Sequence, residues 1–166
     1  AQCLVGSEMC IRDRNKRLER ELFKTIVEHT PLISIDLIIR NDKGEALLGQ
    51  RLNRPAQNYW FVPGGRIYKD ESFEVAFKRI TFEELGVKIS LNDALFLGVY
   101  EHFYNDNFSE AEFSTHYVVH GYEIQLNPQQ LHLPTVQHNS YKWFDVVTLL
   151  NSTIVHQYTK NYFIPR

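Results

Sequence analysis

The chain has 166 residues, of which 43% are apolar and 13% are aromatic, and its formal net charge is -2. This length suits one compact domain with a hydrophobic core. The weak charge argues against nucleic acid as a partner, and no apolar stretch approaches the ~20 residues that a membrane-spanning helix needs.

The first fourteen residues, AQCLVGSEMCIRDR, differ in character from the rest of the chain. Both cysteines and the only methionine lie in this leader, which lacks the apolar core and cleavage site of a signal peptide. It resembles a translated adapter sequence, the alternative being a natural disordered terminus. We expect a single domain over residues 15–166. That domain is free of cysteine, which fits a reducing cytosol.

The first third of this domain predicts one helix and three strands. Residues 15–30 carry apolar side chains at helical spacing, and Pro31 ends the helix because the residue before proline disfavours the helical conformation. Residues 32–51 alternate apolar and polar positions around a turn at 41–44, which predicts a hairpin. Residues 59–65 predict a short strand that closes in a Gly-Gly turn.

The remainder predicts one long helix, three strands and short helical segments. Residues 72–86 form the predicted central helix, and 94–104 and 113–126 read as strands joined by a polar loop. Residues 141–146 predict a strand that leads into a helix, and 153–166 predict a final helix. Hairpins mixed with few helices favour an α/β (α+β) sandwich around a mixed sheet over regular βαβ winding.

The central helix places one carboxylate on its apolar face. At 100° per residue, Phe73, Phe77 and Ile80 form the apolar stripe, and Glu84 falls within it. A carboxylate that faces a core must be paired, protonated or bound to a metal ion. The alternatives are that the helix frays before Glu84 or that an arginine pairs with it.

The residues around this helix resemble the Nudix box, a loop–helix–loop that binds a divalent metal and a nucleoside diphosphate. Gly65, Glu71, Arg79 and the run EELGV at 83–87 occupy the positions of the box. The resemblance implies an α/β/α sandwich around a mixed sheet. One position departs, because Ile80 stands where the box has a glutamate. Fewer carboxylates should hold fewer metal ions, and in-line attack on phosphorus uses two or three.

Motifs outside the box resemble one Nudix subfamily, the GDP-mannose mannosyl hydrolases. These motifs are Arg51, NRPAQNYWFVPGGR (53–66), HFYNDNF (102–108), THYVV (115–119) and QH (137–138). The likeness implies hydrolysis of GDP-mannose, or of GDP-glucose, to GDP and the free hexose. Water would attack the anomeric carbon with inversion. It also implies a cytoplasmic homodimer with one Mg²⁺ per subunit, which Mn²⁺ could replace.

The resemblance also implies roles for individual residues. Three would bind the metal: Gly64 through its carbonyl, Glu84 and Gln137. Three would clamp the diphosphate and the leaving group: Arg51, Arg66 and Arg79. His138 would be the general base, since an imidazole pKa of about 6.5 suits proton transfer from water at neutral pH. The residues that would contact the sugar, the leaving group or another part of the substrate are Asp36, His102, Tyr117, Asn58, Tyr104 and Asn107.

Structural roles remain open for some of these residues. Arg79 could do no more than pair with Glu83 one helical turn away. His138 could be an ordinary loop histidine, and Tyr117 could pack in its strand. Glu71 could be a charge at the helix N-terminus that stabilises the dipole and orients the loop.

Two other functions also remain open. A Nudix pyrophosphatase would cleave a P–O bond and release a mononucleotide. Glu83 favours that reaction, whereas Ile80 and the pair Gln137 and His138 oppose it. A non-catalytic sensor of nucleotide sugars would share the fold, but an intact Glu84 beside Gln137 and His138 argues against a site that only binds.

Overall fold

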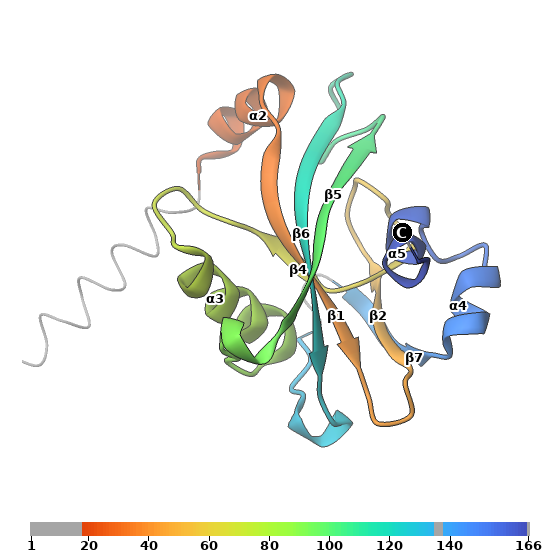
Figure 1. Cartoon of the computed structure of the whole chain (residues 1–166). Coiled ribbons are helices and arrows are strands. Elements are labelled where there is room, and N and C mark those ends of the chain that lie inside the picture. Colours follow the sequence, from red (N-terminus) through yellow and green to blue (C-terminus); the bar gives the residue numbers. More distant parts are fainter. Residues whose placement is uncertain (1–17, 135–137, 166) are drawn as a thin grey trace, which may run out of the picture.

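The computed structural model describes residues 18–134 and 138–165 (Figure 1). In chain order the elements are α2 (Arg20–His29), β1 (Leu32–Arg40), β2 (Ala46–Arg51), β3 (Trp60–Phe61), β4 (Gly64–Arg66), α3 (Phe73–Leu85), the short 3-10 helix η1 (Leu91–Asp93), β5 (Leu95–Tyr104), β6 (Thr115–Gln125), η2 (Pro128–Gln130), β7 (His138–Phe144), α4 (Val146–Asn151), α5 (Gln157–Lys160) and η3 (Asn161–Phe163).

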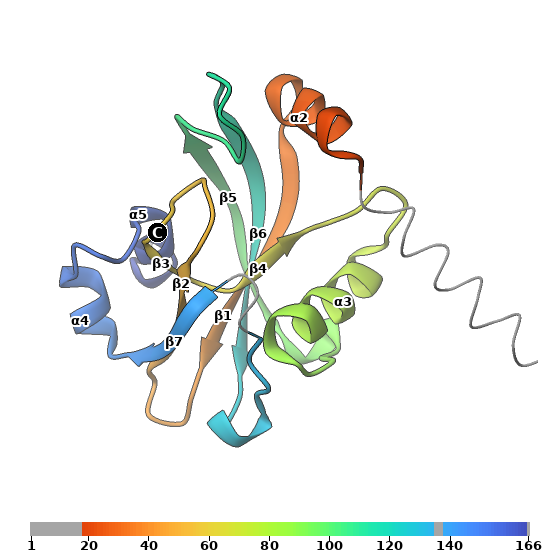
Figure 2. The ribbon, with the colours of Figure 1, turned by 180° about the vertical axis from the view of Figure 1, so that it is seen from behind.

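Within these residues, the strands form one mixed seven-stranded sheet with the order β3-β2-β1-β6-β5, and β4 and β7 pair with β1 and β2. Strand β1 runs parallel to β6 and antiparallel to β2 and β4. Figures 1 and 2 show α3 on one side of the sheet and α4 and α5 on the other. The predicted α/β sandwich around a mixed sheet is therefore confirmed.

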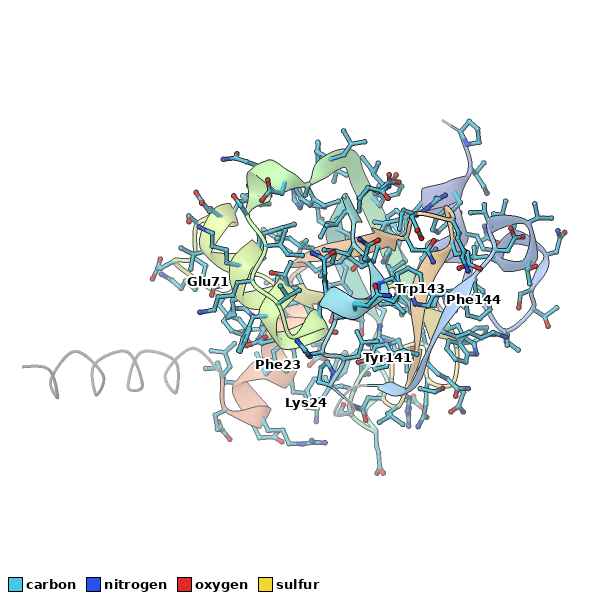
Figure 3. The ribbon with its side chains drawn as sticks, turned by 90° about the horizontal axis from the view of Figure 1, so that it is seen from below. Phe23, Lys24, Glu71, Tyr141, Trp143 and Phe144 are labelled. Carbon is cyan, nitrogen blue, oxygen red and sulfur yellow. The ribbon has the colours of Figure 1, made fainter. Side chains whose placement is uncertain are left out.

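The core consists of two clusters, one on each face of the sheet. Ile35 and Leu37 of β1 pack with Phe77 on the α3 side, whereas Ile38 packs with Leu149 on the α4 side. Strand β7 contributes to both clusters: Tyr141 and Trp143 pack on the α3 side and Phe144 on the other (Figure 3). Because β1 is buried on both faces, its sequence reads as a nearly continuous apolar run.

One predicted turn is a strand in the structure. Residues 59–65 form two short strands, and the Gly64–Gly65 pair belongs to β4. Gly64 lies opposite Asp36 of β1, and Gly65 lies opposite Ile35. The prediction failed because the pairing partner of β4 lies far away in the sequence, so no local pattern indicates it.

Helix α3 begins and ends one residue inside the predicted range of 72–86, and both of its ends are capped. The Ser72 hydroxyl accepts a hydrogen bond from the Val75 amide at 3.3 Å, and Gly86 adopts a left-handed conformation with φ of 72°. The predicted placement of Phe73 in the core is wrong. Its side chain is 40% exposed and lies edge-on against His120 of β6, with ring centres 4.8 Å apart. None of the helices in the described part of the chain is long and apolar enough to cross a membrane.

Replacing Gly86 by alanine should destabilise the fold more than replacing Gly44 by alanine. Both glycines have φ near +70°, which costs an alanine about 1 kcal/mol. A Cβ at Gly86 would overlap the carbonyl oxygen of His132, whereas one at Gly44 would lie 3.6 Å from Nη2 of Arg40. Urea unfolding should therefore show a loss for Gly86→Ala that exceeds the loss for Gly44→Ala by at least ~1 kcal/mol. Equal losses of unfolding free energy in the two variants would show that the backbone at His132 moves away from the new Cβ at little cost.

Candidate active site

A cavity of about 440 Å³ opens between the central strands and the C-terminal half of α3. Its wall is built from β1, β2, β4, β5, β6 and α3, so residues from most of the chain meet there. Most of the predicted site residues contribute to this wall: Asp36, Arg51, Gly64, Arg66, Arg79, Glu84, His102, Tyr104 and Tyr117.

A buried ion pair fixes the loop that precedes α3. The carboxylate of Glu71 is 0% exposed and accepts hydrogen bonds from Nε and Nη2 of Arg79 at 2.7 and 2.8 Å. It also accepts a hydrogen bond from the Tyr68 amide at 2.9 Å, and Arg79 donates to the Arg66 carbonyl oxygen at 2.8 Å and to Glu83 at 2.9 Å. Glu71 therefore orients the loop. Arg79, predicted as a phosphate clamp, holds the loop and the helix together.

Aromatic rings lie beside the arginines of the cavity. The guanidinium carbon of Arg79 lies 3.9 Å from the ring centre of Tyr68, and that of Arg66 lies 4.3 Å from the ring centre of Phe23. Phe23 of α2 also packs against Phe108, with ring centres 4.9 Å apart. Such cation–π contacts help to orient a guanidinium. The sequence analysis did not identify Phe23 or Tyr68, because nothing in the spacing of α2 relates it to the loop before α3.

A buried carboxyl group lies at the base of the cavity. Asp36 accepts a hydrogen bond from the Tyr162 hydroxyl at 2.7 Å, and that hydroxyl lies 3.4 Å from Nε2 of His102. Burial, with a smaller contribution from the nearby charge of Glu84, raises the pKa of Asp36 to about 7 against the opposing effects of the Tyr162 hydrogen bond and the Arg51 charge. Tyr162 was not predicted as a site residue.

Three other side chains that line the cavity, those of His102, Tyr104 and Tyr117, are uncharged at pH 7. Burial, with smaller contributions from the neighbouring His156 and Arg51, lowers the pKa of His102 to about 3. The His102 ring stacks on Tyr158 with centres 4.2 Å apart and planes within 5°. Burial also raises the pKa of Tyr104 and of Tyr117, so both keep their protons. A neutral imidazole and two phenols can exchange hydrogen bonds with an uncharged ligand.

The structure does not support a substrate contact for Asn107. Its side chain is 1% exposed and is used within its own loop, where Nδ2 donates to the carbonyls of Ala111 and Phe113 at 2.8 and 2.7 Å. Its Oδ1 accepts from the amide of Ser109 at 2.7 Å. Asn107 therefore shapes the loop between β5 and β6. Asn58, another candidate, is an exposed turn residue with φ of 70°.

Two predicted site residues fall partly or wholly outside the described structure. Gln137 lies outside the described residues, and so does the side chain of His138. The backbone of His138 begins β7 and lies opposite Arg51 in the ladder with β2. The chain at His138 is thus adjacent to a strand position whose side chain lines the cavity.

Comparison with known proteins identifies the family. Residues 30–163 match the NUDIX domain. The chain belongs to the Nudix family of hydrolases. It is also 40% identical over 129 residues to the low-salt glycan biosynthesis protein Agl8 of Haloferax volcanii. The aligned residues cover 78% of this chain and 80% of that protein.

Solved Nudix structures share the fold. The MutT protein of Methanosarcina mazei Go1 superposes with a TM-score of 0.63 at 24% identity, over 81% of this chain and 92% of that one. The Nudix domain of Shewanella oneidensis NrtR, determined with ADP ribose, superposes with a TM-score of 0.60 at 18% identity, over 88% of this chain and 97% of that domain.

Nudix hydrolases generally use a divalent metal, and the donors at this cavity suit a hard cation. The Glu84 side chain is 2% exposed, and the backbone of Gly64 lies so close to β1 that a Cβ would be 2.6 Å from Oδ1 of Asp36. Among the described residues, no cluster of three His, Cys, Asp or Glu side chains could hold a metal.

The residue at position 80 of this Nudix box belongs to the core. Ile80 is 0% exposed and packs in the same cluster as Leu37 and Phe77. It lies directly beneath β4, since a Cβ on Gly65 would be 3.2 Å from Cγ1 of Ile80. The side chain that replaces a carboxylate of the box thus fills space under the cavity.

The variant Glu71→Ala should lose much more stability than Glu74→Ala. Glu74 pairs with Lys78 on the exposed face of α3, where such a pair contributes about 0.5 kcal/mol or less. Removing Glu71 would leave the guanidinium of Arg79, 17% exposed, without its main partner, which costs roughly 3 kcal/mol. Chemical unfolding of both variants measures the difference. A loss for Glu71→Ala as small as that for Glu74→Ala would mean that Arg79 finds water or Glu83 instead.

Proposed function

We propose that this Nudix hydrolase cleaves GDP-mannose, or a related GDP-hexose, to GDP and the free sugar. Water attacks the anomeric carbon with inversion, the bond between that carbon and the diphosphate oxygen breaks, and GDP departs. One Mg²⁺ per subunit, replaceable by Mn²⁺, is the cofactor. The observation that carries this proposal is the buried Ile80, because a box with fewer carboxylates suits one metal and attack at carbon.

The metal ligands in this proposal are oxygen donors. Glu84, the carbonyl of Gly64 and the side-chain oxygen of Gln137 would hold the ion. When bound, Mg²⁺ neutralises charge on the diphosphate and so makes GDP a better leaving group. Glu84 and Gly64 support this assignment by lining one cavity.

Cations on the cavity wall suit the diphosphate. Arg51 and Arg66 line the cavity with half-buried guanidinium groups, whose planar forks match phosphate oxygens. Arg79 contributes through its charge and by holding the carbonyl of Arg66. These residues would bind the ground state and stabilise the charge that develops on the leaving group.

The uncharged polar side chains of the cavity suit the sugar. His102, Tyr104 and Tyr117 would hydrogen-bond to sugar hydroxyls. Asp36, beside them, would stabilise positive charge at the anomeric centre when it is ionised. His138 would take a proton from the attacking water and is the general base of this proposal.

The relatives are consistent with a sugar-nucleotide substrate. The 40% identical protein of Haloferax volcanii is named for glycan biosynthesis, and the Nudix domain of NrtR was determined with ADP ribose, itself a nucleotide linked to a sugar. We further propose that residues 15–166 form the single catalytic domain, that the protein is cytoplasmic and that it forms a homodimer. Edge strand β5 supports association, since it exposes Phe96, Val99 and Phe103.

One observation favours pyrophosphatase chemistry instead. Glu83 lines the same cavity as Glu84, so a second carboxylate is present there that could bind a second metal ion. Its carboxylate, however, pairs with Nη1 of Arg79 at 2.9 Å, which competes with metal binding. We therefore treat cleavage at phosphorus as the second candidate.

Hydrolysis of GDP-mannose in ¹⁸O-labelled water with Mg²⁺ tests the reaction. We expect the label in free mannose and unlabelled GDP, detected by mass spectrometry, because water attacks carbon. Proton NMR should show that the first anomer formed is the opposite of the one in the substrate. Label in GMP or mannose 1-phosphate would establish attack at phosphorus. Binding of GDP-mannose without any product would support a sensor.

The variants Glu84→Gln and Glu83→Gln test the number of metals. Glu84→Gln should lower Mg²⁺-dependent turnover by roughly 10²-fold or more and weaken Mn²⁺ binding, measured by electron paramagnetic resonance of free Mn²⁺. Glu83→Gln should retain Mn²⁺ affinity. Equal losses of metal affinity in the two variants would support a cluster of two metals and the pyrophosphatase reaction.

A further inference from the structure

The C-terminal segment supplies a side chain that contacts the buried carboxyl of the cavity. Tyr162 of η3 is separated from Asp36 by 126 positions, yet its hydroxyl donates to Oδ2 of Asp36 at 2.7 Å. The same hydroxyl lies 3.4 Å from Nε2 of His102. The phenol of Tyr162 thus lies between Asp36 and His102, two residues that are proposed to contact the sugar.

The two oxygens of Asp36 have different surroundings. Oδ2 faces the Tyr162 hydroxyl, whereas Oδ1 faces the backbone of Gly64. A Cβ added to Gly64 would lie 2.6 Å from Oδ1. A carboxylate held at one oxygen presents the other in a fixed direction. Here that direction is toward β4, the strand that carries the proposed carbonyl ligand of the metal.

The packing around Tyr162 leaves its ring little freedom. The ring lies edge-on against Tyr100 with centres 4.5 Å apart, and Tyr162 is buried. Gly121 of β6 provides the space, since a Cβ there would lie 3.0 Å from Tyr162 and 3.1 Å from Tyr100. A hydrogen bond links the neighbouring α5 to the residue that follows β3: the Val62 amide donates to the Thr159 hydroxyl at 3.4 Å.

We propose that Tyr162 is a positioning residue that holds the carboxyl group of Asp36 in the orientation needed for turnover. It acts through Asp36 and does not line the described cavity wall itself. The hydrogen bond fixes the rotamer of Asp36, so the reactive oxygen is in place before substrate binds. This inference rests on the proposed function for the role of Asp36, but the geometry it describes can be tested separately.

The first test separates binding from turnover. In Tyr162→Phe the ring stays and the hydrogen bond is lost, so kcat should fall roughly 10- to 100-fold while KM for GDP-mannose stays nearly constant. The matched control is Tyr158→Phe, which also removes one hydroxyl from the C-terminal segment. That hydroxyl bonds the main chain of Phe103 at 2.6 and 2.8 Å, so its loss should leave kcat unchanged. An equal fall in both variants would overturn the proposal.

A double-mutant cycle tests whether Tyr162 acts through Asp36. In the Asp36→Asn background, Tyr162→Phe should cause little further loss of kcat, because the group that Tyr162 positions is already gone. A tyrosine that merely supports the fold would lower kcat by the same factor in both backgrounds. If the double variant loses kcat by the product of the two single-variant factors, the proposal is contradicted.

A crystal structure of Tyr162→Phe tests the geometry without any substrate. We expect the carboxyl group of Asp36 to turn away from its original direction while the surrounding backbone superposes. An unchanged Asp36 side chain would overturn the positioning role. If the wild-type protein does not hydrolyse GDP-mannose, the proposed function fails, and this structural result alone decides the inference about Tyr162.

Discussion

The close approach of β4 to β1 and α3 is the constraint on which the cavity depends. A Cβ on Gly64 would lie 2.6 Å from Oδ1 of Asp36, and one on Gly65 would lie 3.2 Å from Ile80. A side chain at position 64 would not fit at 2.6 Å, so the glycine there allows the backbone of β4 to lie against β1. This contact brings the end of α3, which carries Glu84, to the same cavity as the middle of β1.

The cavity combines two arginines with polar side chains that burial keeps uncharged. Arg51 and Arg66 line it together with His102, whose pKa burial lowers to about 3, and Tyr117, whose pKa burial raises. A ligand with an anionic half and an uncharged polar half matches this combination. The diphosphate and the hexose of a nucleotide sugar are such halves. The arrangement is therefore consistent with the proposed substrate class.

Local periodicity predicted the features that one element determines by itself. The helix predicted at 72–86 and the buried position of Glu84 follow from a 3.6-residue repeat, and the structure has a helix at Phe73–Leu85 with Glu84 buried. Contacts between distant segments could not be predicted in this way. Tyr162 bonds a residue 126 positions away, and the pairing of β4 with β1 places Gly64 and Gly65 in a strand. Nor could the sequence show that the Asn107 side chain forms hydrogen bonds within its own loop.

Ile80 explains how the helix can lack one carboxylate of the box and keep the fold. Burying an isoleucine contributes about 1.5–3 kcal/mol, whereas a carboxylate at a fully buried position is costly unless a cation compensates it. Ile80 therefore contributes to the core beneath β4 without needing a bound cation. A helix that keeps only Glu84 at the buried position provides less charge to bind metal. In the proposed reaction, more of the catalysis would then come from residues of the sheet, where Asp36 and His102 line the same cavity.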